Sequence, residues 1–380
     1  MPHPSPPATT PLRGKPKLGK RLLLLATTLC VSAMIAEVLY RALKPAPYKT
    51  AEIVTVDGKR VPNSEIAHFL RTSDEDAIAM HPRGTLKPGL ELKQWYDRPT
   101  QPEFDSDGCV SIKFNSLGFR DRPFTIEKQL GEFRILAVGD SFTFGSGVQD
   151  EDTWPQQLEE RLRSERETPV EVINAGFATG SHHVAGYVDW IRSDGADFKP
   201  DILMIGLCLN DVGQIPMLGY PVLKAEQPWL GGISEILNTI QNSMTMREVK
   251  QQKLDDSLLL QFETARAIQE KSDVSWPAAQ DGFRSIKSIA AESGMRLIVA
   301  VFPMVTQLND RYPLVHTHET IGEFLKAEGI ESLDLLSNFM GREESDLWVH
   351  PTDQHPNKIG QDLIAAGIHD YLKANPSKPN

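Results

Sequence analysis

The sequence predicts an α/β fold: a doubly wound, parallel, five-stranded sheet in flavodoxin-like strand order, with helices on both faces. Two observations predict this class. Five short runs of aliphatic and β-branched residues are bounded by turn residues, as buried parallel strands are. Segments with apolar residues at helical spacing separate them, and this alternation is typical of doubly wound sheets. The chain has 380 residues, 40% of them hydrophobic, which is enough for one large core.

The N-terminal segment predicts a membrane-spanning helix. Residues 1–21 contain five basic residues and no acidic one, and residues 22–43 are mainly apolar. Because basic residues flank the cytoplasmic end of such a helix, we expect a cytoplasmic tail and an uncleaved signal anchor. This orientation predicts a single-pass membrane protein whose domain after residue 43 is extracytoplasmic, in the periplasm. Arg41 would anchor the far end by snorkelling. A signal peptide cleaved after Val31-Ser32-Ala33 is the alternative.

The segments that follow divide the chain. Residues 44–104 contain many prolines and polar residues without periodicity, so we expect a juxtamembrane stalk and an irregular extension. The domain proper then spans residues 105–380. Its lead-in, Val110-Ser-Ile-Lys-Phe-Asn-Ser-Leu-Gly-Phe-Arg-Asp121, is expected to form a short strand and a turn and to pack over one edge of the sheet.

Strands and helices of this domain are expected in alternation. We expect the strands at about 134–139, 170–175, 201–209, 296–302 and 331–336. We expect helices near 153–165, 183–193, 316–328 and 357–373, with Pro356 in the first turn of the last helix. Residues 212–293 form a helical insertion between the third and fourth strands, which we expect to cover the active site or to bind a partner.

The first strand ends in Gly139-Asp140-Ser141. A serine at the carboxyl end of a parallel strand lies at the edge of the sheet where ligands bind. Gly139 allows a sharp turn there, and Asp140 can brace the loop through local hydrogen bonds. Ser141 is therefore the candidate nucleophile.

Other strand ends carry polar residues in a fixed order. Asn174-Ala175-Gly176 ends the second strand, and the third ends in Gly206-x-x-x-Asn210-Asp211. Near the C-terminus stands Thr352-Asp353-Gln354-His355-Pro356-Asn357. The order Ser, Gly, Asn, His resembles the four sequence blocks of the SGNH (GDSL-type) hydrolase superfamily, over about residues 105–375. The lead-in before the serine is similar to that of membrane-anchored members.

A catalytic triad follows from the chemistry of these residue types. A serine hydroxyl is a weak nucleophile and needs a neighbouring base, for which His355 is the candidate. Asp353 would orient the imidazole and stabilise its charge. The spacing is D-x-H, whereas D-x-x-H is commoner in the superfamily, and Thr352 stands at the usual acid position. Phe142 replaces the leucine after the serine.

An oxyanion hole is implied by the resemblance. Its donors would be the backbone N–H of Ser141, a glycine N–H and the side-chain amide of Asn210. The spacing in the superfamily favours Gly180 as the glycine, with Gly176 as the alternative.

Several residues have competing interpretations. His350, with Asp346, is an alternative base, and His182-His183 would contact substrate or face solvent. A metal-dependent phosphoesterase is a further alternative, in which Asp140, Asp211 and His355 would hold a divalent ion. The sequence has neither the spacing of common metal motifs nor a P-loop, so we expect no metal and no cofactor.

Charge and cysteines restrict partners and compartment. The first 43 residues carry six basic residues and one acidic residue, so the net charge of −11 leaves about −16 for the rest. This disfavours nucleic acid as a partner and favours a neutral substrate. Cys109 and Cys208 could pair outside the cell, but Cys208 lies in a predicted central strand, which favours a buried free thiol.

These observations predict a membrane-anchored, extracytoplasmic serine esterase that hydrolyses acetyl or other short acyl esters of an envelope glycan or lipid. An O-acyltransferase with the same site is the nearest alternative. A non-catalytic envelope scaffold or glycan-binding protein is another, because fold does not imply function. An envelope protein partner is compatible with each of these functions.

Overall fold

The structure is a computed structural model that describes residues 18–43, 48–55, 57–63, 87–178, 183–212, 236, 276–310 and 312–376. Its first element is the helix α1, Leu18–Leu43. The stretch Gly19–Leu43 is long and apolar enough to cross a membrane, as expected, and none of it is buried. Glu37, the acid that interrupts the apolar run, pairs with Arg41 one turn later at 2.7 Å. Because α1 falls in a different compact unit from residues 48–221 and 248–380, we describe it by itself.

The predicted central sheet is confirmed. Its five strands run in the order β6-β5-β7-β8-β9, which is the flavodoxin-like order, and every neighbouring pair is parallel. The strands are β5 (Phe133–Gly139), β6 (Val170–Gly176), β7 (Ile202–Cys208), β8 (Arg296–Phe302) and β9 (Glu331–Asp334). All residues of β7 are buried, as expected for a central strand covered on both faces.

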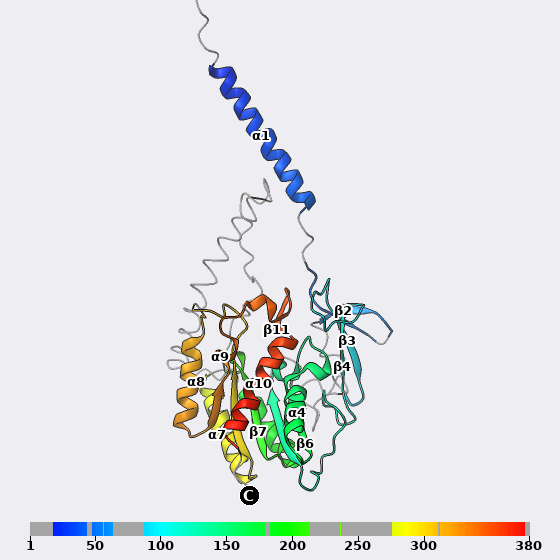
Figure 1. The fold of residues 1–380 in the computed structure, drawn as a ribbon, viewed down its shortest axis with the longest axis vertical. Helices are drawn as coiled ribbons and strands as arrows, with labels where there is room; N and C mark the ends of the chain where they lie inside the picture. The colour runs from blue at the N-terminus through cyan, green and yellow to red at the C-terminus, as the bar shows by residue number, and fades with distance from the viewer. Residues whose placement is uncertain are drawn as a thin grey trace, which may run out of the picture. The chain divides into compact units, whose positions relative to one another are not determined.

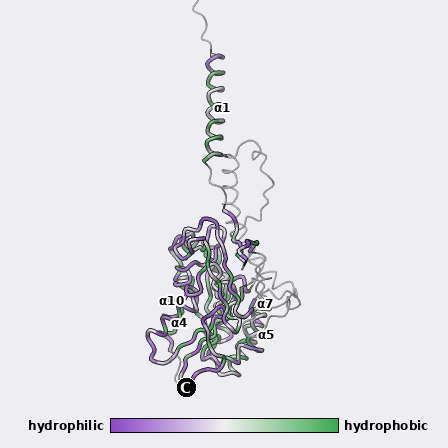
Figure 2. The backbone as a smooth tube through the Cα atoms, turned by 90° about the vertical axis from the view of Figure 1, so that its right-hand side faces the viewer, coloured by the Kyte–Doolittle hydropathy of each residue, from purple (hydrophilic) through white to green (hydrophobic). Residues whose placement is uncertain are grey.

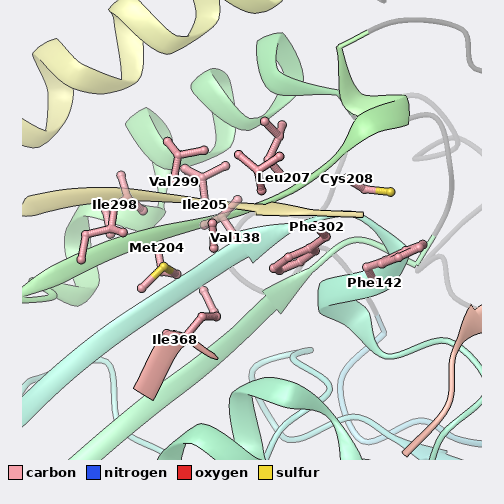
Figure 3. Packing of buried hydrophobic residues seen from close by; sticks show 14 of the residues in the cluster. Val138, Phe142, Met204, Ile205, Leu207, Cys208, Ile298, Val299, Phe302 and Ile368 are labelled. Atoms are coloured by element: carbon pink, nitrogen blue, oxygen red, sulfur yellow. The ribbon is translucent and has the colours of Figure 1, made fainter. Parts of the chain in front are cut away.

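Helices cover both faces of this sheet (Figures 1 and 2). On one face α4 (Trp154–Glu165) packs against α10 (Lys358–Ala374), and on the other α5 (Val184–Ser193) packs against α7 (Trp276–Glu292). The fifth helix, α8 (Val315–Ala327), lies beside α7, where Phe324 meets Trp276 edge to face. Each predicted helix matches an observed one to within one or two residues. Figure 3 shows the resulting core, with Val138, Ile205 and Val299 of the strands and Ile368 of α10.

The N-terminal extension contributes three strands to a second sheet, which the sequence did not predict, and the fourth strand is the short one expected from Val110. The antiparallel order is β2-β1-β3-β4, with β1 Glu52–Val54, β2 Arg60–Pro62, β3 Glu91–Trp95 and β4 Cys109–Lys113. The expectation of an irregular segment is therefore wrong for the described part of 44–104. Strands of three residues are too short to show the alternation that reveals a strand. Since β3 pairs with β4, the boundary expected at residue 105 lies inside this sheet.

The segment expected as a helical insertion ends in α7. That helix buries one apolar face and contacts α5 and β8, so it is one of the helices that cover the central sheet. The rest of the segment, apart from its start at 212 and residue 236, lies outside the described residues.

Short elements complete the carboxyl edge of the sheet. They are α3 (Ser141–Phe144), α9 (Leu336–Phe339), β10 (Trp348–His350), β11 (Asp353–Pro356) and the 3-10 turns η3 (Asp150–Asp152), η5 (Leu209–Asp211) and η6 (Glu344–Asp346). The 3-10 turn η4 (Gly195–Phe198) precedes β7 at the opposite edge. Cys109 and Cys208 are both buried free thiols, in agreement with the prediction for Cys208.

Candidate active site

Ser141 lies two residues after the end of β5, at the first position of α3. Asp140 caps this short helix: its side chain accepts a hydrogen bond from the Phe142 N–H at 2.9 Å. Gly139 is required because a Cβ there would lie 2.4 Å from the Gly206 carbonyl oxygen of the neighbouring strand. The glycine thus allows the close approach of β5 and β7, and its φ is not in the positive range, so its predicted role in a sharp turn stays a prediction. Phe142 stacks on Phe302 at a ring distance of 6.4 Å, and Figure 3 shows the pair at one end of the core.

His355 and Asp353 meet Ser141 from the other end of the chain. The Nε2 atom of His355 lies 2.9 Å from the Ser141 Oγ, and its Nδ1 lies 2.5 Å from the Asp353 Oδ1. Both residues belong to β11, where side chains two positions apart point to the same face. A D-x-H spacing therefore suits a strand, which explains the departure from the commoner D-x-x-H.

Polar contacts of α10 hold β11 in place. Asn357 is the N-cap of α10, accepting hydrogen bonds from the N–H groups of Ile359 and Gly360. Pro356 is the last residue of β11, so the expectation that it starts the helix is wrong, because the asparagine takes the cap. The buried Gln361 donates to the Phe142 carbonyl at 3.2 Å, which ties α10 to the serine turn.

Charge and burial set the protonation of the pair. Burial alone would lower the pKa of His355, but the charge and hydrogen bond of Asp353 outweigh it, so the pKa of His355 is raised. Burial would raise the pKa of Asp353, but the charge and hydrogen bond of His355 and a hydrogen bond from Tyr96 lower it. The carboxylate is therefore ionised at neutral pH, and His355 is a stronger base than an isolated histidine.

Asn210 lies in η5, next to the serine turn. Its side chain hydrogen-bonds Asp140, whose pKa burial nevertheless raises. The neighbouring Asp211 is also buried, and accepts from the Tyr187 hydroxyl and the Cys208 N–H, each at 3.0 Å. Burial and the charge of Asp140 raise the pKa of Asp211 well above its usual range. These contacts fix the turn that carries the Asn210 amide.

The two glycines considered for an oxyanion hole differ in what the structure describes. Gly180 lies outside the described residues. The N–H of Gly176 donates to the Asn174 side chain at 3.0 Å, so this amide already has a partner. A Cβ at Gly176 would lie 2.1 Å from the Phe144 nitrogen, and the glycine thus allows β6 to approach α3.

The alternative histidines occupy other environments. His350 is buried, with Nδ1 2.8 Å from the Thr352 Oγ1 and Nε2 2.8 Å from the Asp97 carbonyl oxygen. Both ring nitrogens of His350 thus contact groups other than Ser141. Thr352, which stands at the usual acid position, contacts His350 and not His355. His183 occupies the N-cap position of α5, and His182 lies outside the described residues.

A metal site is not formed by the acids near the serine. Within the described ranges, no group of three or more His, Cys, Asp or Glu side chains has the geometry to hold a metal ion. Asp140 and Asp211 point their oxygens at backbone N–H groups, the Asn210 amide and the Tyr187 hydroxyl, which are partners a metal would have to displace.

Two residues that shape the site were missed by sequence reasoning. Tyr96, directly after β3, donates its hydroxyl proton to the Asp353 Oδ2 at 2.7 Å. Arg120 is buried and donates to the carbonyl oxygens of Phe144, Gly145 and Val148, which belong to the loop after Ser141. Of the two, only Arg120 lies in a segment that the sequence analysis singled out, the lead-in before Ser141. That segment does pack at the edge of the sheet, where the Asp121 side chain accepts a hydrogen bond from the Asn174 N–H.

A nucleophile, a base in contact with it and an acid in contact with the base are the parts needed to form an acyl-enzyme. The fold and these contacts define a serine hydrolase with an α/β architecture. Residues 137–363 match the model of the GDSL-like Lipase/Acylhydrolase family, which is more than half of the chain. The chain belongs to this family.

Solved structures with similar folds are remote in sequence. A protein of the lipolytic G-D-S-L family from Desulfitobacterium hafniense DCB-2 is 17% identical, with a TM-score of 0.39 over 63% of this chain and 99% of its own. The esterase EstA from Pseudoalteromonas sp. is also 17% identical, with a TM-score of 0.38 over 63% and 97%. A two-domain esterase active on acetylated mannans is 16% identical, with a TM-score of 0.40 over 66% and 52%. No curated protein matches the chain.

Proposed function

We propose that the protein is a membrane-anchored, extracytoplasmic serine esterase that removes acetyl or other short acyl groups from a neutral glycan or lipid of the cell envelope. The observation that carries the proposal is the contact of 2.9 Å between the His355 Nε2 and the Ser141 Oγ, with Asp353 behind the histidine.

The reaction would proceed in two steps. His355 takes the proton of Ser141 as its oxygen attacks the ester carbonyl, and then gives that proton to the leaving alcohol. Water, activated by the same histidine, hydrolyses the acyl-enzyme. The Ser141 N–H, the Gly180 N–H and the Asn210 amide would stabilise the oxyanion in both steps.

The N-terminal segment supports this location of the enzyme. The apolar helix α1 follows a basic stretch, which favours a cytoplasmic N-terminus and an outer domain. The net charge of about −16 after residue 43 favours a neutral substrate. Together these features support an ester of the envelope as the substrate.

Turnover of p-nitrophenyl esters by the full chain in detergent tests the proposal. We expect hydrolysis of the acetate, with kcat/KM falling as the acyl chain lengthens, and loss of turnover in Ser141→Ala and His355→Ala. His350→Gln is the matched control, because it removes the competing histidine and should retain activity. Turnover that survives in Ser141→Ala would contradict the proposal. Acylation of Ser141 without hydrolysis of the acyl-enzyme would contradict the esterase activity and favour an acyltransferase.

A further inference from the structure

Asp353 is held at both of its carboxylate oxygens. Its Oδ1 accepts from the His355 Nδ1 at 2.5 Å and from the His355 backbone N–H at 3.2 Å. Its Oδ2 accepts from the Tyr96 hydroxyl at 2.7 Å. A turn of the carboxylate away from this geometry would break bonds at both oxygens, so Tyr96 and His355 together fix its plane.

The surroundings of Tyr96 fix its hydroxyl in turn. The residue is fully buried, and its ring meets Phe104 edge to face at 5.2 Å. Its backbone N–H donates to the Gly108 carbonyl at 2.9 Å. A Cβ at Gly147 would lie 2.9 Å from the hydroxyl oxygen, so the glycine leaves room for it. Burial, then the charge of Asp353, raise the pKa of Tyr96 well above its usual range, so the hydroxyl stays a donor.

Tyr96 comes from a part of the chain outside the match to the family. That match begins at residue 137, whereas Tyr96 directly follows β3 of the antiparallel sheet. Asp353 lies on β11, and from there its Oδ2 accepts from the hydroxyl of Tyr96, the residue that follows β3 of the antiparallel sheet. The hydrogen-bonded series Tyr96–Asp353–His355–Ser141 therefore connects the residue after β3, through β11, to the first residue of α3.

We propose that Tyr96 is a positioning residue for the Ser141–His355–Asp353 triad, and that the antiparallel sheet β1–β4 is a functional part of the hydrolase domain. This inference rests on the proposed function. Tyr96 acts on the reaction through Asp353: by holding the carboxylate, it holds the imidazole in the orientation that accepts the serine proton.

The variant Tyr96→Phe tests the inference in the full chain with p-nitrophenyl acetate. It keeps the ring and removes one hydrogen bond to a charged group, so we expect kcat to fall about 10- to 100-fold with KM unchanged. Tyr371→Phe is the matched control, because it also removes a tyrosine hydroxyl bonded to a carboxylate, that of Glu331 at 3.0 Å. Glu331 begins β9 and thus lies at the opposite end of the sheet. Tyr371→Phe should retain full kcat.

A double-mutant cycle separates positioning from general stabilisation. If Tyr96 acts through Asp353, Tyr96→Phe should cause no further loss of kcat in an Asp353→Ala background. An equal loss in both backgrounds, or an unchanged kcat in the single variant, would overturn the inference. Turnover that persists in Ser141→Ala would instead show that the proposed function is wrong, so the two failures are distinguishable.

A second measurement keeps the inference testable if Tyr96→Phe does not fold. Incorporation of 3-fluorotyrosine makes every tyrosine hydroxyl a stronger donor and keeps the sequence intact. A stronger donor at Oδ2 withdraws charge from Asp353, so the low-field NMR signal of the His355 Nδ1 proton should move upfield. A signal that stays in place would overturn the inference.

Discussion

His355 has to be neutral to accept the serine proton, which makes the pH dependence of activity a test of its environment. Burial lowers the pKa of His355, and Asp353 more than offsets this, so the pKa lies above the ordinary value of 6.5. Activity should therefore rise with pH through a midpoint above 6.5. Asp353→Asn removes the larger contribution that raises the pKa of His355 and leaves the burial and the smaller contribution of Asp140, so the midpoint should move to lower pH.

The pH profile of kcat/KM for p-nitrophenyl acetate measures both midpoints. We expect Asp353→Asn to lower the maximal rate as well, because a neutral amide stabilises the imidazolium less than a carboxylate. An acid limb that stays in place or moves to higher pH in Asp353→Asn would contradict the assignment of these two residues.

Asn210 provides a second test at the scale of the residue. Its amide is held by Asp140, and removal of one oxyanion donor costs about 10²–10³ in kcat in other enzymes. We expect Asn210→Ala to lower kcat by about that factor relative to the wild type, with KM little changed. The residual rate of Ser141→Ala serves as the background. A change in kcat of about twofold or less would remove Asn210 from the oxyanion hole.

Individual residues were predictable from the sequence where their chemistry was local. Ser141 stands out because it follows a predicted strand, and Asp353 and His355 because they stand in the last of the superfamily's sequence blocks; the structure brings the three side chains into contact. Tyr96 was not predictable, because nothing in the sequence near it reports on Asp353, which lies 257 positions later. Such a contact is a property of the tertiary fold.

At the scale of the element, Arg120 connects the lead-in to the loop after α3. Its guanidinium donates to three carbonyl oxygens of that loop and pairs with Asp150 at 2.7 Å. Arg120→Ala would leave these acceptors unpaired in the interior. We expect the free energy of unfolding to fall by about 3–5 kcal/mol, as when one partner of a buried ion pair is removed.

Urea denaturation followed by tryptophan fluorescence measures this loss. Arg192→Ala is the control, because its guanidinium is well exposed and lies 3.9 Å from Asp189, so we expect a change within about 0.5 kcal/mol. Equal stabilities of the two variants would show that the loop does not depend on Arg120.

The central strands and helices were predictable because each long element carries its own periodic pattern. The expected bounds of β8, 296–302, are the observed ones. The short strands β1 and β2 carry no such pattern, since pairing with β3 and burial of Ile53 and Val61 define them. Pro356 was misplaced because a cap depends on side-chain geometry, which Asn357 supplies.

At the scale of the whole molecule, the order of the sheet followed from general rules of chain topology, but the domain boundary did not. Only β4 of the antiparallel sheet has a sequence signal, so the sequence predicts an irregular extension for residues 44–104. The strand pairing of β3 with β4 instead places residues 48–55, 57–63 and 87–113 with the hydrolase domain.

The N-terminal helix yields a prediction about the location of the protein. If α1 is an uncleaved anchor, the full chain should stay in the membrane fraction after carbonate extraction, and its N-terminal sequence should remain that of the gene product. A variant without residues 1–43 expressed behind a cleavable export signal should be recovered in the soluble periplasmic fraction. A mature protein that begins near residue 34 would show a cleaved signal peptide instead.

The central claim is that His355 activates Ser141 as a nucleophile. The most direct test is labelling of the full chain with a fluorophosphonate, followed by peptide mapping by mass spectrometry. We expect one adduct, on Ser141, and its absence in Ser141→Ala and in His355→Ala, with His350→Gln labelled like the wild type. A folded wild-type protein that takes no label, or an adduct on another residue, would contradict the claim.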